Sequence, residues 1–128
     1  MRLVVGSDHA GFPLKGELLL YLRGLGHEVD DVGSFDPNPV DFPDIARKVA
    51  AAIGANKMKG IRAAVCHDVH SAHQCVEHDD VNVMCIGAQI VGAWLAKDLI
   101  AAYLSAQFST EEEFRRRVAK LAEMDAGR

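Results

Sequence analysis

The chain has 128 residues, of which 49% are hydrophobic and 25% charged; these values predict one globular domain over residues 1–128 and exclude a disordered protein. Its net charge of −4 provides no positive field for nucleic acid or an acidic membrane surface. The three cysteines form no Cys-x-x-Cys motif, and the first apolar run is shorter than a signal peptide requires. We therefore expect a cytoplasmic protein with no nucleic-acid or membrane partner.

Strand and helix patterns alternate through the first half of the chain. A short apolar run predicts a buried strand and a turn over residues 2–8, and leucines at helical spacing predict the helix that follows. Weak alternation predicts a second strand over residues 27–33. Three prolines indicate a loop over residues 34–44, with Asp41 as the predicted N-cap of a helix over residues 42–53.

The alternation continues in the second half. We expect strands over residues 61–66 and 81–87, separated by a helix in the histidine-rich segment 67–80. Strands that alternate with helices predict an α/β domain with a mostly parallel sheet, and such sheets bind ligands at the carboxyl ends of their strands. The candidates at those ends are Ser7, Asp8, His9, His67 and Asp68.

Two further helices are predicted after the last strand. The first covers residues 88–108, and we expect its buried side to carry Ile90, Val91, Trp94 and Leu95. The second covers residues 109–125, with Ser109 and Glu112 as a capping box.

The histidine-rich segment "HDVHSAHQCVEHDD" raises the question of a metal site. His70 and His73 are three residues apart and can share a helix face. A structural zinc site usually needs four well-placed ligands, whereas this helix would scatter its candidates around the axis. We therefore expect no metal here and interpret His70, His73 and Cys75 as surface or partner-facing residues.

His78 lies where this helix is expected to end. With Asp79, Asp80 and Asn82 close by, its imidazole can be oriented for proton transfer, and its ordinary pKa near ~6.5 suits acid and base chemistry. A solvated histidine in a polar turn explains the same pattern equally well. Asp8 is similarly open to two interpretations, a ligand contact or the N-cap of the following helix, and the second is the more common.

Three consecutive arginines, Arg115 to Arg117, stand in the last predicted helix. Guanidinium groups suit phosphate, but successive positions lie about 100° apart on a helix, so at most two can face one anion. The alternative is a solvated face that is balanced by the acidic residues 111–113.

Together the segments "GSDHAGFPLK", "DFPD", "ANKMKGIRAAVCHD", "EHDDVNVMCIG" and "RRV" resemble type B ribose-5-phosphate isomerases, in the same order and nearly end to end. That family shares its fold with the galactose-6-phosphate isomerase subunits. The resemblance implies a three-layer, Rossmann-like, doubly wound parallel sheet. It also implies a metal-free enzyme without a cofactor that interconverts aldose and ketose phosphates as a homodimer or a dimer of dimers, with helix 109–125 packing on a partner subunit.

The resemblance also implies the residues that carry the chemistry. His78 and Asp8 match the catalytic positions: His78 opens the sugar ring, and Asp8 lines the sugar pocket with His9. Asp79 stands beside His78 where the family often has asparagine.

The other implied substrate contacts are an amide and two guanidinium groups. Asn56 corresponds to an asparagine near the active-site loop. Arg117 matches an arginine that binds the substrate phosphate, often from the neighbouring subunit, and Arg116 is a candidate to reinforce it.

One part of the family pattern is absent. Where Ile53 runs into Gly54, the family inserts a strand and the turn Cys/Ser-Gly-Thr/Ser-Gly-x-Gly, which supplies the proton-transferring residue. The gap is roughly 20 residues long. Either the sheet closes around it, another chain fills it, or the sequence omits a segment of the natural product. The sequence thus predicts a sugar-phosphate isomerase of the pentose phosphate pathway or, alternatively, a non-catalytic sugar-phosphate-binding homologue or partner subunit.

Overall fold

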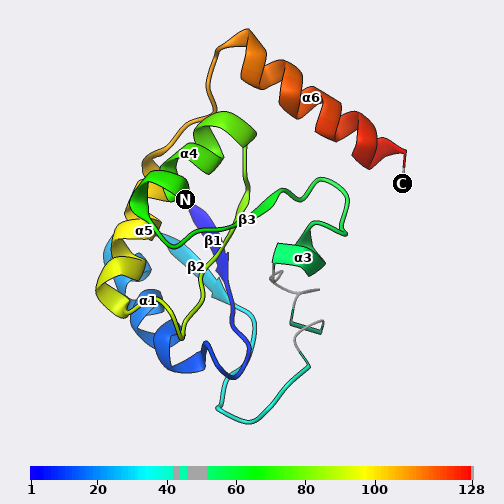
Figure 1. The fold of residues 1–128 in the computed structure, drawn as a ribbon. Coiled ribbons are helices and arrows are strands. Elements are labelled where there is room, and N and C mark those ends of the chain that lie inside the picture. Colours follow the sequence, from blue (N-terminus) through cyan, green and yellow to red (C-terminus); the bar gives the residue numbers. More distant parts are fainter. Residues whose placement is uncertain (42–43, 46–51, 128) are drawn as a thin grey trace.

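The computed structural model describes residues 1–41, 44–45 and 52–127 (Figure 1). Most of the helix predicted over residues 42–53 lies outside these ranges. The described strands and helices follow the alternating order expected from the sequence. They are β1 (Arg2–Val5), α1 (Phe12–Gly24), β2 (Glu28–Asp31), α3 (Ala52–Ala55), β3 (Ala63–Val65), α4 (Val69–Asp79), β4 (Val83–Cys85), α5 (Ala93–Ser105) and α6 (Glu112–Ala126).

The strands pair in parallel, as the sequence predicts, but in two separate pairs. β1 pairs with β2, and β3 pairs with β4. Within the described part of the chain, neither β1 nor β4 has a second strand neighbour. A cleft of about 950 Å³ lies between them; we call it the inter-sheet cleft, and it is lined by every residue of β1 and of β4. The sheet is therefore interrupted at the place where the sequence predicts a missing central strand.

Three helices cover one face of the strands and hold the two pairs together. α1 contacts β2, and α5 contacts both α1 and α4. Apolar side chains of α5 form the core of this layer: Ala96 and Leu99 are fully buried, and Ile100 is nearly so. α3 packs against β3 and β4, on the side of the strands away from α5 (Figure 1).

The buried face predicted for the helix over residues 88–108 is wrong. The helix begins at Ala93, after a turn stabilised by hydrogen bonds from the N–H groups of Ile90 and Val91 to the Gly87 carbonyl. Because the helix starts later, a different face turns inward, and Trp94 is 91% exposed. Of the four residues expected on the buried side, Val91 alone is buried.

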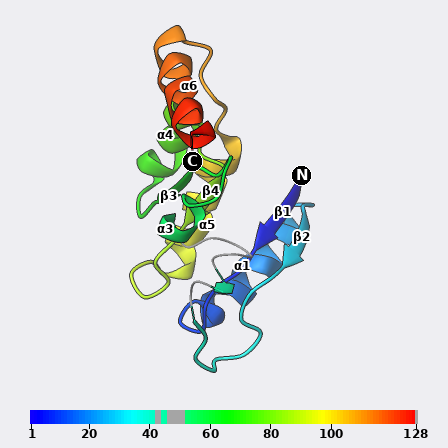
Figure 2. The ribbon, with the colours of Figure 1, turned by 90° about the vertical axis from the view of Figure 1, so that its right-hand side faces the viewer.

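The last helix also begins later than expected. α6 starts at Glu112, and its N-cap is Glu111, so Ser109 and Glu112 do not form a capping box. Ser109 instead accepts a hydrogen bond from the Glu111 N–H at 3.1 Å. No residue of α6 is buried, and the helix projects from the body of the domain beside the end of α4 (Figures 1 and 2). No described helix is long and apolar enough to cross a membrane.

A buried lysine fixes the carboxyl end of β2 against α1. Lys15 is only 4% exposed, and its Nζ donates hydrogen bonds to Asp31 Oδ1 at 2.6 Å and to the Ser34 carbonyl at 2.5 Å. The Phe35 ring lies 4.7 Å from the same ammonium group. Since a buried charge is tolerated only with such partners, Lys15 has a structural role that the sequence did not reveal.

We expect Lys15→Met to lower the free energy of unfolding by about 2–3 kcal/mol, because it leaves the partly buried Asp31 carboxylate without its cation. The matched control is Lys97→Met, which removes an exposed ion pair with Glu17 and should cost less than about 1 kcal/mol. Urea denaturation of both variants measures the difference. Equal losses would contradict a special role for Lys15.

Candidate active site

The turn after β1 positions the first two predicted site residues. Asp8 Oδ1 accepts a hydrogen bond from the Gly11 N–H at 2.9 Å and so holds the turn that precedes α1, whose N-cap is Gly11. His9 Nδ1 accepts from the Val40 N–H at 3.3 Å. In a neutral ring the proton then resides on Nε2, which can donate to a sugar hydroxyl. The Asp8 carboxylate keeps its second oxygen as an acceptor.

Close packing at this end of the strands requires glycine at position 33, where the neighbour is backbone, and leaves little room at position 87, where the neighbour is a side chain. A Cβ on Gly33 would lie 2.6 Å from the Ser7 nitrogen, and one on Gly87 would lie 3.0 Å from His67 Nε2. His67 Nε2 in turn accepts a hydrogen bond from the Gly87 N–H at 3.2 Å.

A buried hydroxyl lies beside the Asp8 turn without a hydrogen-bond partner among the described residues. It belongs to Ser7, and the Ser34 hydroxyl on the neighbouring loop is in the same state. A buried hydroxyl that lacks a partner costs free energy, so such a group at the ligand edge of a sheet is consistent with a site that a ligand or another segment completes.

A second group of predicted residues gathers where α4 ends. The His78 ring stacks on Phe114 of α6, with ring centroids 4.0 Å apart and planes 12° apart. The Arg117 guanidinium lies 5.6 Å from the centre of the same Phe114 ring. The Ser109 N–H donates to the Glu77 carbonyl at 2.9 Å and ties the segment before α6 to α4. The predicted ring-opening histidine and phosphate-binding arginine therefore meet at one aromatic ring.

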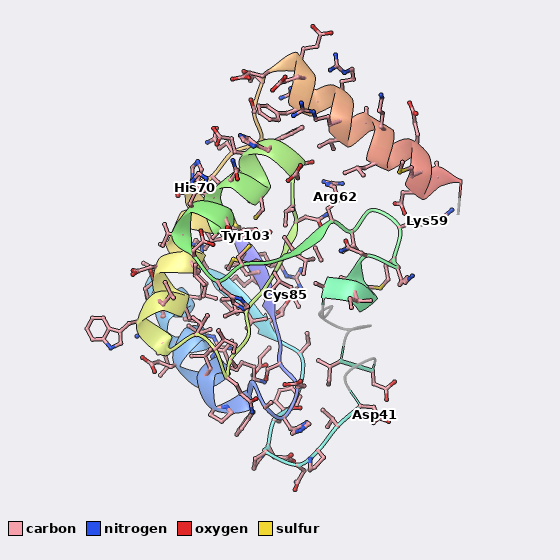
Figure 3. The ribbon with its side chains drawn as sticks, in the orientation of Figure 1. Asp41, Lys59, Arg62, His70, Cys85 and Tyr103 are labelled. Atoms are coloured by element: carbon pink, nitrogen blue, oxygen red, sulfur yellow. The ribbon has the colours of Figure 1, made fainter. Side chains whose placement is uncertain are left out.

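The two groups lie at opposite ends of the strands in one chain. Asp8 and His9 follow the carboxyl end of β1, whereas α4 runs back along the strands and brings His78 to their amino ends. Figure 3 shows this separation: Arg62, which precedes β3, lies on the side of α6, and Asp41 lies at the far end. Residues 8, 9 and 78, which the resemblance assigns to one sugar site, therefore lie apart in a single chain, because the crossover helix α4 reverses the chain direction.

Three further predicted residues differ in their availability. Asp79 and Arg116 are exposed at the same end as His78. Asn56 is already engaged: its amide donates to the Ala63 carbonyl at 2.9 Å and accepts from the Ala63 N–H at 2.8 Å. Asn56 therefore pairs with the start of β3 in this structure, and its role toward substrate stays a prediction.

Histidine and aspartate side chains at the start of α4 do not form a metal centre. Asp68 is the N-cap of α4 and accepts hydrogen bonds from the Ser71 N–H at 2.7 Å and the Ser71 hydroxyl at 2.6 Å, which lower the pKa of the carboxyl group. The His73 and Glu77 side chains face each other on the helix surface, 3.7 Å apart. Across the described residues, no three His, Cys, Asp or Glu side chains are grouped so that they could hold a metal ion.

The three cysteines are poor nucleophiles in this fold. Burial raises the pKa of Cys66 and of Cys85, and it raises the pKa of Cys75 to about 12. Cys66 Sγ and Cys75 Sγ lie 3.8 Å apart, so ionisation of one thiol also disfavours ionisation of the other. Because the thiolate is the reactive form, none of the three thiols is suited to replace the Cys or Ser of the family turn.

Phe114 is a site residue that the sequence did not identify. Its neighbours in "EEEFRRR" are all charged, and only its position one helical turn before Arg117 and Val118 hinted at an inward-facing ring.

We expect the free energy of unfolding to fall as the pH rises above about 9, toward 12. In this range the Cys75 thiol ionises in the unfolded chain but stays protonated in the folded one. Cys75→Ala should therefore reduce the slope between pH 9 and pH 10.5 in urea denaturation. Tyr103→Phe is a second, independent test, because burial also raises the Tyr103 pKa to about 12, so each variant should remove part of the slope. An unchanged slope in Cys75→Ala would contradict this assignment.

Comparison with known proteins identifies the family. The ribose/galactose isomerase family matches residues 3–121. The ribose-5-phosphate isomerase B of Escherichia coli (strain K12) is 36% identical in an alignment of 127 positions, gaps included, that covers 84% of this chain and 85% of that protein. The 4-deoxy-4-sulfo-D-erythrose isomerase of Clostridium sp. (strain MSTE9) is 32% identical over 149 positions, covering 99% of this chain and 94% of that protein. Because that alignment is longer than the chain itself, the relative contains residues without a counterpart here.

A solved structure extends the likeness to three dimensions. The ribose-5-phosphate isomerase B of Clostridium thermocellum superimposes with a TM-score of 0.94 at 33% identity, over 99% of both chains. This confirms the Rossmann-like α/β fold predicted from the sequence. The chain belongs to the ribose/galactose isomerase family of sugar-phosphate isomerases.

Proposed function

We propose that this chain binds ribose 5-phosphate or a closely related sugar phosphate in sites formed between two copies, as the substrate of aldose–ketose isomerisation. The observation that carries the proposal is the placement of the two residue groups at opposite ends of the strands. Asp8 and His9 supply acceptors and donors for sugar hydroxyls, whereas His78 and Arg117 supply an acid–base group and a cation. In a homodimer the Asp8 and His9 group of each copy meets the His78 and Arg117 group of the other copy, so the dimer has two sites.

Each side chain has a distinct part in the proposed reaction. The His78 imidazole transfers a proton during ring opening, and stacking on Phe114 fixes the plane of the ring. Arg117 binds the phosphate, and Arg116 and Asp79 are exposed at the same end of the strands. Binding of the phosphate orients the reacting carbons, which lie several bonds away. The turn after β1 holds the hydroxyl groups of the sugar through Asp8 and His9.

The substrate class follows from the positive charge of the group at the amino ends of the strands, where Arg116 and Arg117 lie. The E. coli relative is named for ribose 5-phosphate and the Clostridium sp. relative for a sulfonated erythrose, and both substrates carry an anionic group at one end of a short sugar. Two exposed arginines, 116 and 117, suit such an anion. Ribose 5-phosphate is our first choice because the E. coli protein and the solved structures share that name.

Proton transfer between C1 and C2 needs a base that this chain lacks in the expected place. The family turn is missing at Ile53, and the thiols are held in the protonated form. We therefore propose that this chain alone binds the sugar phosphate but turns it over slowly. The exposed α6, with no buried residue, supplies the surface that packs on the second copy.

Mixed oligomers test whether the site is shared. Asp8→Asn/His9→Ala removes the carboxyl-edge group, and Arg117→Ala removes a charge-assisted contact worth roughly a tenfold to hundredfold loss in affinity for ribose 5-phosphate. After the two variants are unfolded and refolded together, calorimetric titration should find about a quarter of the wild-type number of tight sites, since half of the dimers are mixed and each has one intact site. Arg23→Ala, on α1, is the control for loss of a surface arginine.

Recovery of no tight sites would contradict a site shared between copies, and absence of wild-type binding at millimolar ligand would contradict the proposed substrate.

A coupled assay of ribose 5-phosphate turnover tests the second part of the proposal. We expect a kcat/KM far below the value of about 10⁴ M⁻¹s⁻¹ or more that is usual for enzymes. Robust turnover that is lost in Cys66→Ala but kept in Cys75→Ala would contradict the assignment and make Cys66 the base.

A further inference from the structure

The inter-sheet cleft lies between two strands and has about the volume of one further strand. Its lining includes all residues of β1 and β4, one residue of β3 and none of β2, so it lies between the inner strand of each pair. In Figure 2 the two pairs of strands stand apart, and in Figure 3 Cys85 of β4 lies in the middle of the molecule. Its volume of about 950 Å³ compares with roughly 800 Å³ for a five-residue strand, taken as ~16 Å long, ~4.8 Å wide and ~10 Å thick.

The backbone of β1 directs hydrogen-bonding groups into this cleft. The carbonyls of Met1 and Val5 accept hydrogen bonds from the Glu28 and Val32 N–H groups, so alternate residues of β1 face β2. The N–H and C=O of Val4, which lies between them in this alternation, point the other way, toward the cleft. Within the described part of the chain no neighbouring strand receives these groups.

β4 has the same arrangement on the opposite wall. The Val83 N–H donates to the Arg62 carbonyl, and the Cys85 carbonyl accepts from the Cys66 N–H. These residues face β3, so the N–H and C=O of Met84 point toward the cleft. Two strand edges thus border one cleft, and an exposed edge is a template for another strand.

The side chains around the cleft are suited to an uncharged strand. Val4 is 54% exposed in β1, and much of the remaining lining is apolar, including Leu14, Leu18, Met84, Ile86 and Ile100. The charged side chains of the lining already have partners: Arg2 pairs with Asp30, Lys15 pairs with Asp31, and Asp8 accepts a hydrogen bond from the Gly11 N–H. Apolar surface that stays exposed in this way gains free energy when another apolar segment covers it.

We propose that the inter-sheet cleft is a receptor for one extended, apolar strand from a partner chain, which pairs with β1 on one side and β4 on the other. The partner supplies valine- or isoleucine-rich sequence of at least five residues without charged side chains in its middle. This inference concerns the sheet and is independent of which sugar phosphate the chain binds.

A synthetic peptide tests the receptor directly. The probe has about six alternating valine and isoleucine residues with a lysine at each end for solubility. At saturating concentration it should raise the Tm of the protein by at least about 4 °C. Hydrogen exchange of the Val4 and Met84 amides should slow by at least about tenfold, since both amides gain carbonyl partners.

Matched controls separate strand pairing from general apolar binding. The same peptide with alternate amide nitrogens methylated keeps its side chains but loses half of its donors, and it should cause no shift. Val4→Pro removes the donor that faces the cleft, and it should abolish the response, whereas Val4→Thr keeps the donor and should respond like the wild type. If Val4→Pro does not fold, the methylated peptide alone decides.

Three results would overturn the proposal. The first is an equal shift with the methylated peptide, and the second is no shift with the unmodified one. The third is protection of the Val4 and Met84 amides without peptide: at all protein concentrations it would assign the cleft to a segment of the same chain, and at high concentration alone it would assign it to a second copy.

Discussion

The contact of α5 with both α1 and α4 is the constraint on which the rest of the structure depends. Parallel strands are normally held together by their own hydrogen bonds, but here β1 and β4 are not neighbours. The helical layer holds the two strand pairs together instead, through the buried alanine and leucine side chains of α5. Because this layer survives the loss of a strand, the chain keeps the family fold over nearly its whole length while its sheet stays divided.

Neither of the two groups of predicted site residues is part of the divided sheet. The carboxyl-edge turn with Asp8 and His9 follows β1, and the group of His78, Phe114 and Arg117 is built by α4 and α6. Neither depends on the absent segment for its local geometry. What the absent segment would add is the proton-transferring side chain and the inner strand of the sheet. In the proposed function, the two residue groups hold the sugar phosphate, and the segment that the resemblance implies is missing would move the proton between its carbons.

The proposed oligomer and the proposed strand receptor draw on different surfaces. A shared sugar-phosphate site needs the two ends of the strands, together with α6, whose side chains are not buried in one chain. The receptor needs the inner edges of β1 and β4, whose N–H and C=O groups are directed by the register of each strand pair. A strand in the cleft would extend both pairs at once, and Ser7, whose buried hydroxyl has no partner among the described residues, lines the same cleft.

The sequence by itself determined the order of the elements and the parallel pairing, because hydrophobic periodicity is a local signal. The roles of the residues around Asp8 and His78 and the position of the missing strand at Ile53 stay predictions. Helix starts were less certain: the turn at Gly87 and the late start of α6 changed which faces are buried and left Trp94 exposed. Only the tertiary structure decided that the site groups lie at opposite ends of the strands, that Phe114 joins His78 to Arg117, and that a divided sheet encloses a cleft. Each of these depends on how segments distant in the chain are packed, and no local pattern encodes that packing.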